Sequence, residues 1–489
     1  MAAWLLIIIL VPCLWLPLFL LWRRSNINVS RFTVGEAKLI PPRGNWCIPF
    51  VGENLQFLLN SPDSFFRKRS LRYGNMFRTE IFGSQTVVTS TPEQAKQILA
   101  IRHKSFRPFY PPSIGILLNH PSWEGSFHQR VRKIIQAPLL AEALQNRMAK
   151  LDRITMWVLD SWESKSYVIT HDETRKIAFH VALDIACGLS PGSESMRLLD
   201  GYGYVAEGAM YIPICIPGST FSKAVQKSKY ILERLSELVA DRRAQKYDLM
   251  DDVLSSLMES KDENGLTLSD QEIRDILLVF LFAGHETTSA FLVWIVKYLA
   301  ENQEILENVK KEHNIIRENK KSDEEPLDWL DVQNMPLTLR VVQETLRLAN
   351  VVAFSPRESC ENVEIDGHLI PKGWKVQVYY RHFHLSPKHY KDPLKFDPSR
   401  FEVPPPAGIY MPFGNGTRLC PGADLVKLEA LIFVHRLVTN YRWEVVAPDS
   451  GTKYWLCAKP RDGLKIKVKS LHHPRNMADL NNAYEPSRC

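Results

Sequence analysis

A single cysteine in a glycine-rich stretch is the residue whose type and setting point most directly to chemistry. The stretch runs Phe413-Gly-Asn-Gly-Thr-Arg-Leu-Cys420-Pro-Gly422, and its glycines let the backbone approach a flat, bulky partner. Apolar residues follow at helical spacing, so Cys420 is expected just before a helix N-terminus, where the helix dipole should lower the pKa of its thiol. A thiolate with such backbone clearance suits a ligand to a haem iron. The alternative is an inert buried cysteine in a turn.

Polar residues interrupt an apolar stretch further upstream. Residues 276–282 are apolar on all sides of a predicted helix, and Ala283-Gly-His-Glu-Thr287-Thr288 follows before apolar residues resume. Burying polar groups is costly unless they have partners, so a function is the better explanation for them. Ala283 leaves space beside a cofactor, and Thr287 can donate a hydrogen bond to a carbonyl of its own helix. Glu286 and Thr287 are therefore the candidate catalytic pair, able to relay protons toward a cofactor.

A glutamate and two arginines are placed to form a scaffold. Glu344 and Arg347 lie one helical turn apart and can pair, although such pairs are also common on solvated helix faces. Arg400 follows in residues 396–401, Phe-Asp-Pro-Ser-Arg-Phe. A buried, bidentate network of these three would fix the loop that carries Cys420, and would support folding rather than chemistry.

Local patterns outline the elements that must position these residues. Ser269, with Glu272 three residues later, is the predicted N-cap of the apolar helix. Residues 76–90 alternate between apolar and polar and predict a β-hairpin, and residues 363–378 predict a second hairpin around a Pro-Lys-Gly turn. Residues 126–137 predict a basic helix, which is either a solvated surface or a face that binds an anionic group.

The amino-acid composition limits the classes of protein to which this chain can belong. The chain has 489 residues, of which 45% are hydrophobic and 24% charged, as is ordinary for a globular protein with a large core. Its net charge of +7 fits an acidic protein partner or a membrane surface and does not suggest nucleic acid. The 8 cysteines are scattered without a Cys-x-x-Cys pair, which argues against a zinc site or a disulfide scaffold.

Four segments are expected along the chain. Residues 1–24 hold an uncharged apolar run of about the length that spans a bilayer, closed by Arg23 and Arg24. They are interpreted as a membrane anchor that leaves the following domain in the cytoplasm, with a cleaved signal peptide as the alternative. After the anchor we expect a linker and proline-rich hinge over residues 25–52, a catalytic domain over residues 53–471 and a polar, disordered tail over residues 472–489.

The order and spacing of these features resemble those of the cytochromes P-450. The resemblance covers nearly the whole chain, and the Cys420 loop matches Phe-x-x-Gly-x-Arg-x-Cys-x-Gly at every fixed position. It implies a mainly α fold with small β-sheets in a single large domain, and haem b held by Cys420. It also implies a monooxygenase that uses O₂ and electrons from NADPH, delivered by NADPH–cytochrome P-450 reductase. The likeness is to microsomal members of the family, so we expect a single-pass protein of the endoplasmic reticulum membrane with its catalytic domain facing the cytoplasm.

The resemblance also assigns further cofactor contacts. A Trp-x-x-x-Arg pair in the family's basic helix binds haem propionates, and here the aromatic position is His128, four residues before Arg132. That departure leaves the strength of the His128 contact in doubt, since a neutral imidazole has only one donor. Arg357 either reaches a haem propionate or pairs with a surface carboxylate. The implied haem-binding set is Cys420, Arg418, Phe413, Gly416, His128, Arg132 and Arg357.

The expected substrate is a small hydrophobic molecule, a polycyclic isoprenoid. Residues 370–376, 411–416 and 420–422 resemble those of plant enzymes that oxidise isoprenoids, and the loop from Phe106 to Arg132 most resembles that of ent-kaurenoic acid oxidase and the related triterpene oxidases. Abscisic acid 8′-hydroxylase and brassinosteroid oxidases are the next closest. Arg107 either meets a substrate carboxylate or faces water or a haem propionate. The candidate pocket residues are Phe106, Arg107, Tyr110, Ile114, Leu117, Ala283, Val352, Phe354 and Trp455.

Two other functions remain open at this point. A haem-thiolate isomerase or dehydratase would need neither O₂ nor a reductase, but such relatives typically alter the threonine helix and the cysteine loop, which are both intact here. A non-enzymatic haem carrier or sensor would not require Glu286 and Thr287. NADPH-dependent consumption of O₂ separates these functions from a monooxygenase.

Overall fold

The computed structural model describes residues 33–34, 37–45, 52–59, 61–119, 124–244, 251–322, 324–447, 450–454 and 456–471. The predicted anchor, most of the hinge and the predicted tail lie outside them. The described chain is mainly α-helical with small β-sheets, as the sequence predicts. It forms two compact units. The β-rich unit holds residues up to Phe109, Phe354–Ser386 and Gly414–Arg418, and the helical unit holds Tyr110–Ala353, Pro387–Phe413 and the residues from Leu419 on.

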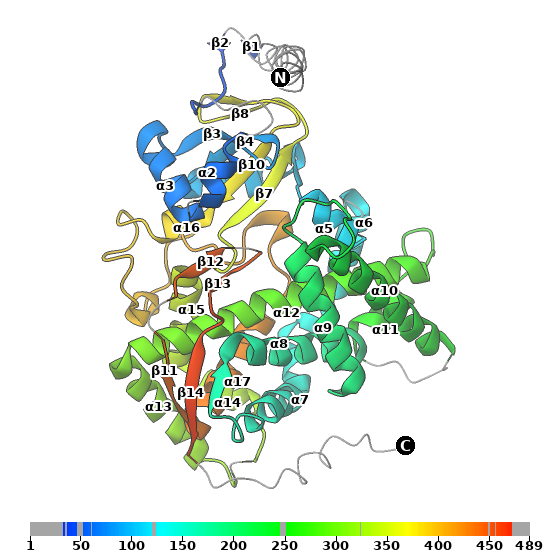
Figure 1. The fold of residues 1–489 in the computed structure, drawn as a ribbon, viewed down its shortest axis with the longest axis vertical. Coiled ribbons are helices and arrows are strands. Elements are labelled where there is room, and N and C mark those ends of the chain that lie inside the picture. Colours follow the sequence, from blue (N-terminus) through cyan, green and yellow to red (C-terminus); the bar gives the residue numbers. More distant parts are fainter. Residues whose placement is uncertain are drawn as a thin grey trace, which may run out of the picture. The chain divides into compact units, whose positions relative to one another are not determined.

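The β-rich unit is built on a five-stranded sheet in the order β3-β4-β10-β7-β5 (Figure 1). β3 (Met76–Ile81) and β4 (Ser84–Thr89) form the first predicted hairpin. Its two-residue turn, Phe82-Gly83, has positive φ at both positions, as a type I′ turn requires. The unit's other elements are β1 (Thr33–Val34), β2 (Ala37–Lys38), α2 (Asn54–Leu59), α3 (Pro62–Tyr73), α4 (Pro92–Lys96), β5 (Phe106–Pro108), β7 (Phe354–Ser359), β8 (Val363–Ile365), β9 (His368–Ile370), β10 (Lys375–Tyr379) and α16 (Tyr380–His384).

The prediction of a second hairpin over residues 363–378 pairs the wrong strands. β8 pairs with β9 across an Asp366-Gly367 turn, again with positive φ at both residues. β10 instead joins the large sheet, antiparallel to β7 and parallel to β4. An Asp-Gly pair is the stronger signal for a two-residue turn, and it outweighs the Pro-Lys-Gly sequence on which the prediction rested.

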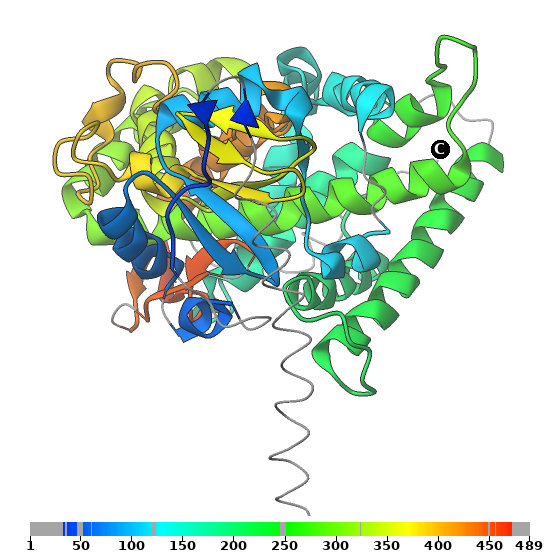
Figure 2. The same cartoon turned by 90° about the horizontal axis from the view of Figure 1, so that it is seen from above.

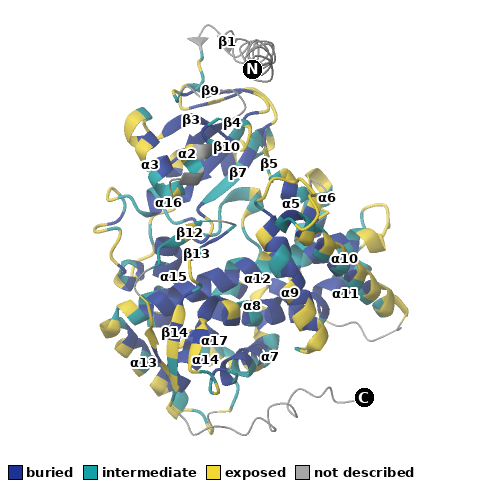
Figure 3. Ribbon diagram, in the orientation of Figure 1, coloured by how far each residue is buried: buried dark blue, intermediate teal, exposed yellow. Residues whose placement is uncertain are grey.

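The helical unit is organised around α12 (Asp270–Glu301), a helix of 32 residues. Ser269 accepts a hydrogen bond from the Glu272 N–H at 3.3 Å, and the Glu272 carboxylate accepts one from the Ser269 N–H at 2.8 Å, so the predicted N-cap is confirmed. α8 (Thr170–Cys187) runs along α12 (Figures 1 and 2), and most of α12 is buried (Figure 3). α12 is long and apolar enough to cross a membrane, but 72% of its most apolar window is buried inside the protein, as expected for a core helix.

Polar contacts fix α17 (Ala423–Asn440), the helix that follows Cys420. Asp152 accepts hydrogen bonds from Nε and Nη2 of Arg436 at 2.7 and 2.5 Å, and both side chains are buried. Breaking a buried ion pair leaves an unpaired charge, so α17 is costly to displace. The unit's other elements are α5 (Pro112–Leu117), α6 (Gly125–Gln136), α7 (Ala141–Asp160), β6 (Tyr167–Ile169), α9 (Ser193–Gly208), α10 (Thr220–Ala244), α11 (Val253–Glu259), α13 (Gln303–Glu318), α14 (Trp329–Gln333), α15 (Pro336–Ala349), β11 (Tyr441–Val445), β12 (Thr452–Tyr454), β13 (Ala458–Pro460) and β14 (Lys465–Ser470).

Candidate active site

Cys420 lies in the helical unit, two residues before the Gly422 N-cap position of α17, as predicted. Its N–H donates to the Phe413 carbonyl at 3.0 Å, and the Gly422 N–H donates to the thiol. Nη1 of Arg132 donates to the Leu419 carbonyl at 2.6 Å, which brings a cation of α6 to the loop. The loop therefore presents one thiol with a backbone donor and a guanidinium close to it.

The pKa of the Cys420 thiol differs from the expectation. Burial raises this pKa above its ordinary value, while the hydrogen bond from Gly422 and the charge of Arg132 act in the opposite direction with less effect. In the protein without a bound metal ion, the predicted lowering of the pKa is therefore wrong. The free-energy cost of removing water from a thiolate exceeds the stabilisation that the nearby dipole and charge provide. A coordinating metal ion deprotonates a thiol outright, so the raised pKa does not oppose ligation of iron.

One face of α12 is open, although most of the helix is buried. Ala283 is exposed and Gly284 and Thr287 are half-exposed, whereas Phe282 and Thr288 beside them are only 7% and 1% exposed. Oγ1 of Thr287 donates to the Ala283 carbonyl at 2.7 Å, as predicted. Ala283 thus leaves space along this face, whereas a Cβ at Gly284 would lie 3.2 Å from Cβ of Ala182 in α8, so the glycine serves the packing of the two helices. An open face of this kind leaves room for a flat cofactor such as haem.

Glu286 lies on a different side of α12 from Thr287. Its carboxylate is 3.3 Å from Nε of Arg175 and 3.5 Å from Nζ of Lys459, with His171 at 3.9 Å. Burial alone would raise the pKa of Glu286, but neighbouring charges, Lys459 first and then His285 and Arg175, lower it to about 2. Glu286 is therefore ionised at neutral pH and holds no proton to donate. Thr287 and Glu286 thus have different surroundings, and their joint role in proton relay stays a prediction.

Sequence reasoning missed the cations around Glu286. Arg175 belongs to α8 and Lys459 to β13, both more than one hundred residues from Glu286 in the chain. Neither residue stands in a local pattern that marks it. The signal that was present is a physical one: a carboxylate inside a buried helix requires cationic or hydrogen-bonding partners from elsewhere in the fold.

The predicted scaffold triad is assembled within the helical unit. Nε and Nη2 of Arg347 donate to the Glu344 carboxylate at 2.7 and 2.8 Å, and neither side chain is exposed. Nε of Arg400 approaches the same carboxylate at 3.3 Å. Nη1 of Arg347 also donates to the Pro393 carbonyl at 2.9 Å. The network thus ties α15 to the segment from Pro393 to Arg400, and its role in haem retention stays a prediction.

The β-rich unit holds three of the proposed haem contacts, Gly416, Arg418 and Arg357. Gly416 has a φ of 73°, and a Cβ there would lie 2.0 Å from the carbonyl oxygen of Leu99, so only glycine fits. Arg357 is 9% exposed, and its Nη1 donates to the Pro356 carbonyl at 2.8 Å. The two alternatives for Arg357, a haem propionate and a surface carboxylate, both stay predictions.

The helical unit holds the remaining proposed contacts. His128 and Arg132 are both half-exposed and four residues apart on α6, so they share a face as predicted. The Phe413 ring centroid is 5.8 Å from Nζ of Lys427. The haem-binding roles of these residues, and of those in the β-rich unit, remain predictions.

Arg107 is engaged within the β-rich unit. Its Nη2 donates to the Glu358 carboxylate at 2.7 Å, across the pairing of β5 with β7. Lys375 pairs with the same carboxylate. About half of the Arg107 side chain, 48%, is exposed. The alternative in which Arg107 faces water therefore fits, and the proposed contact with a substrate carboxylate loses its basis.

The other pocket candidates differ in exposure. Leu117 has no exposed surface and Ile114 is 7% exposed, because α5 packs against α9 and α10. Leu117 is therefore packed in the core, and its role as a lining residue stays a prediction. Trp455 lies outside the described residues. Of the remainder, Tyr110, Ala283 and Val352 are exposed, Phe354 is half-exposed and Phe106 is buried.

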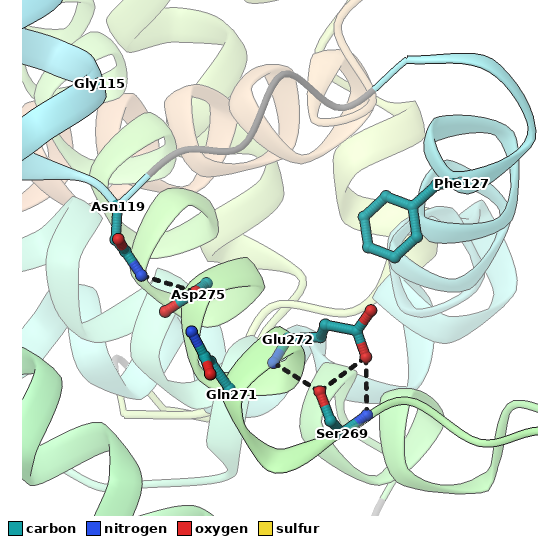
Figure 4. Close-up of a pocket in the computed structure, with 7 residues that line it drawn as sticks. All are labelled: Gly115, Asn119, Phe127, Ser269, Gln271, Glu272 and Asp275. Carbon is teal, nitrogen blue, oxygen red and sulfur yellow. Dashed lines mark hydrogen bonds between the residues drawn. The ribbon is translucent and has the colours of Figure 1, made fainter.

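A polar cleft of about 700 Å³ lies beside the N-terminus of α12 (Figure 4). Asn119 donates to the Asp275 carboxylate at 2.8 Å within it. Ionised and amide groups in this number do not suit a hydrocarbon ligand, so this cleft is not a candidate for the apolar substrate. Its lining consists of Gly115, Asn119, Phe127, Ser269, Gln271, Glu272 and Asp275.

Comparisons with known proteins agree with one another. The family model described as cytochrome P-450 matches residues 41–467, a stretch that spans both units as one domain. An abscisic acid 8′-hydroxylase of Solanum lycopersicum is 38% identical over 444 residues, 90% of this chain and 93% of the relative. Abscisic acid 8′-hydroxylase 4 of Arabidopsis thaliana is 37% identical over 459 residues, 93% of this chain and 97% of the relative. The solved structure of retinoic acid-bound cyanobacterial CYP120A1 has a TM-score of 0.81 at 29% identity, and the match covers 89% of this chain and 100% of that one.

Proposed function

Because the chain belongs to the cytochrome P-450 family, whose members bind haem and use O₂ with electrons from a reductase, we propose that it hydroxylates an isoprenoid carboxylic acid. The enzyme is a monooxygenase of a hydrophobic isoprenoid. Abscisic acid, oxidised at its 8′ position, is the first candidate substrate. The sequence placed ent-kaurenoic acid and triterpenes first and abscisic acid second, and the relatives favour the second choice.

The observation that carries this proposal is identity with abscisic acid 8′-hydroxylases over nearly the whole chain. The identity is 38% over 90% of the chain for the first relative and 37% over 93% for the second, so the likeness is not confined to the short motifs of the family. The cyanobacterial structure supports the same ligand class, since retinoic acid is also a carboxylic acid.

The residues of the site have distinct roles in this proposal. Cys420 would hold the haem iron through its thiolate. When bound, haem supplies activation of O₂ for insertion of one oxygen atom into a C–H bond. Ala283, which is exposed, lets the substrate lie close to α12, because its side chain is only a methyl group. Thr287 holds a proton at Oγ1 against the Ala283 carbonyl, and rotation of the hydroxyl can present this proton to the open face.

Two parts of the proposal rest on sequence. We expect NADPH–cytochrome P-450 reductase to be the electron donor, and residues 1–24 to anchor the enzyme in the endoplasmic reticulum membrane. An anchor would place the enzyme where hydrophobic substrates concentrate.

Reconstitution of the full-length protein with NADPH–cytochrome P-450 reductase tests the proposed function. Abscisic acid and ent-kaurenoic acid are supplied separately, and products are identified by mass spectrometry. We expect hydroxylated abscisic acid that requires both NADPH and O₂. Product from ent-kaurenoic acid with none from abscisic acid would overturn the substrate assignment, and product without NADPH would favour the isomerase alternative.

A further inference from the structure

The peptide unit between Leu419 and Cys420 is held at both of its ends. The Leu419 carbonyl and the Cys420 N–H belong to this one planar unit and point to opposite sides of it. The Cys420 N–H donates to the Phe413 carbonyl at 3.0 Å, and the Leu419 carbonyl accepts a hydrogen bond from Nη1 of Arg132 at 2.6 Å. The two hydrogen bonds fix the plane of the unit, and with it the direction in which Cys420 extends its thiol.

α6, the helix that carries Arg132, is itself anchored on its other side. Nη2 of Arg130 donates to the carbonyls of Ser260 and Leu266 at 2.8 and 2.9 Å. Asp262 stabilises this turn between α11 and α12, because its Oδ1 accepts a hydrogen bond from the Leu266 N–H at 2.8 Å. Residues two apart on a helix lie about 200° apart around its axis, so Arg130 and Arg132 extend from nearly opposite sides of α6. The turn thus holds the helix in a position from which Arg132 reaches the Leu419 carbonyl.

Arg132 also brings a permanent charge to the cysteine. Burial raises the pKa of the Cys420 thiol, and the Gly422 N–H and the charge of Arg132 act in the opposite direction. A cation that stabilises a thiolate also lessens the electron density that the sulfur can donate to a bound iron. Hydrogen bonds and charges around a cysteine ligand are among the features by which a protein sets the reduction potential of its iron.

We propose that Arg132 is a positioning residue for the cysteine ligand, which holds the Leu419–Cys420 peptide in its plane and limits electron donation by the thiolate. The inference rests on ligation of the haem iron by Cys420, but not on the identity of the substrate. It goes beyond the contact with a haem propionate that the resemblance implies, because the hydrogen bond of Arg132 is to the loop that carries the ligand. Arg132 acts through that loop and is not a catalytic residue.

The haem-loaded, full-length enzyme without substrate tests this role by two readouts that do not depend on turnover. The first is the reduction potential of the iron, which falls when the thiolate donates more strongly. The second is the C–O stretching frequency of the reduced carbon monoxide complex, measured by infrared absorption. This frequency also falls as more electron density reaches the iron.

Arg132→Met removes both the hydrogen bond and the charge while keeping an unbranched side chain. We expect the reduction equilibrium to shift about tenfold toward the oxidised enzyme, which is about 59 mV for one electron, because one charge-assisted contact is lost. The C–O frequency should fall in the same variant. Arg132→Lys keeps a cation that can donate to the Leu419 carbonyl and should recover most of both values.

Lys133→Met is the matched control. Lys133 is the next residue of α6 and is exposed, so its replacement removes an equal charge from the same helix and leaves the hydrogen bond to Leu419 in place. Both readouts should stay at their wild-type values. A shift in the control as large as that in Arg132→Met would show a general effect of charge and would overturn the assignment.

Transfer of haem to apomyoglobin separates this role from a contact with a propionate alone. If Arg132 contacts only a propionate, Arg132→Met should release haem faster while its C–O frequency stays at the wild-type value, and that result would overturn the inference. A lower C–O frequency in Arg132→Met, recovered in Arg132→Lys, supports it at any rate of haem release. Should Arg132→Met not retain haem, Arg132→Gln takes its place, because it keeps an amide donor and removes the charge, and it should change both readouts in the same direction.

The remaining outcomes separate this inference from the proposed function. Product from ent-kaurenoic acid with none from abscisic acid would overturn the substrate proposal and leave the role of Arg132 intact. A wild-type enzyme whose reduced carbon monoxide complex lacks the thiolate-type spectrum would overturn ligation by Cys420, and this inference with it. Wild-type values of both readouts in Arg132→Met would overturn the role of Arg132 alone.

Discussion

Thr287 and Glu286 are neighbours in α12, but their surroundings differ in charge, burial and accessibility. Thr287 is half-exposed on an open face, and its hydroxyl bonds only within its own helix at Ala283. Glu286 is 4% exposed and is held by Arg175 and Lys459 from two other elements. One helix therefore offers a site for a neutral proton carrier and, about 100° further round, a fixed charge.

The difference shows how a buried helix accommodates two polar residues at different cost. Thr287 needs no tertiary partner, because a threonine can satisfy its hydroxyl on the preceding turn. Glu286 needs cations, because an isolated carboxylate in the interior would be unstable. We therefore expect substitution of Glu286 to affect stability and substitution of Thr287 to affect chemistry.

The largest expected effect is on the stability of Glu286→Ala. Removing the carboxylate leaves Arg175 and Lys459 without their buried partner, which typically costs about 3–5 kcal/mol. Their side chains are 19% and 21% exposed, so water relieves part of the cost and we expect the lower end of that range. Urea unfolding of the ligand-free variant measures the loss. A loss as small as that of Thr287→Ala would contradict the distinction between the two faces.

The pH dependence of stability should also depend on Glu286. Burial is the main cause that lowers the pKa of His285 to about 4 from 6.5, and the nearby cations lower that of Glu286 to about 2 from 4.5. Both pKa values are lower in the folded than in the unfolded protein. His285 therefore contributes its full stabilisation of the fold above pH 6.5, and Glu286 above pH 4.5. As the pH falls, the contribution of His285 to stability is lost between pH 6.5 and 4, and that of Glu286 is lost between pH 4.5 and 2.

The variant Glu286→Gln isolates the second loss. It keeps the shape of the side chain and removes the titrating group, so the fall in unfolding free energy below pH 4.5 should become shallower than in wild type. Parallel curves for the two proteins in that range would show that Glu286 does not contribute.

A smaller effect on stability, but a clear effect on chemistry, is expected for Thr287→Ala. The variant loses one hydrogen bond on an open face, worth about 0.5–1.5 kcal/mol. It should retain haem, form less product per NADPH consumed and release more peroxide. Thr287→Ser keeps the hydroxyl and should retain most of the coupling. If the alanine variant couples as well as wild type, Thr287 is not the proton carrier.

The smallest expected effect is at Gly203. Alanine in place of glycine within a helix usually stabilises by about 0.5–1 kcal/mol. At Gly203 the new Cβ would meet Arg175, whereas at Gly115, in α5, nothing lies within 4 Å. We expect Gly115→Ala to stabilise and Gly203→Ala to stabilise less or not at all, as measured by thermal unfolding. Equal gains would mean that Arg175 moves aside without cost.

Local motifs of the fold and site could be predicted from sequence. Ser269 with Glu272, and Glu344 with Arg347, act over one helical turn, so their partners lie within a few residues. The hairpin over residues 76–90 is equally local. These features depend on chain geometry over short distances and are visible without a tertiary structure.

Features set by tertiary packing could not be predicted in this way. The partners of Glu286 come from α8 and β13, and Leu117 is buried by α9 and α10. For Cys420, the sequence shows the helix that follows but not the burial that raises the thiol pKa. The Glu358 partner of Arg107 depends on the pairing of β5 with β7. In each case a long-range contact decides the outcome.

The central claim is that Cys420 holds the haem iron, since the roles of both faces of α12 depend on it. The most direct measurement is the absorption spectrum of the reduced carbon monoxide complex in wild type and in Cys420→Ala. We expect wild type to give the spectrum of a thiolate-ligated haem and the variant to lose it, with Cys457→Ala, at a buried cysteine of the same unit, unchanged. A thiolate-type spectrum that persists in Cys420→Ala would contradict the account.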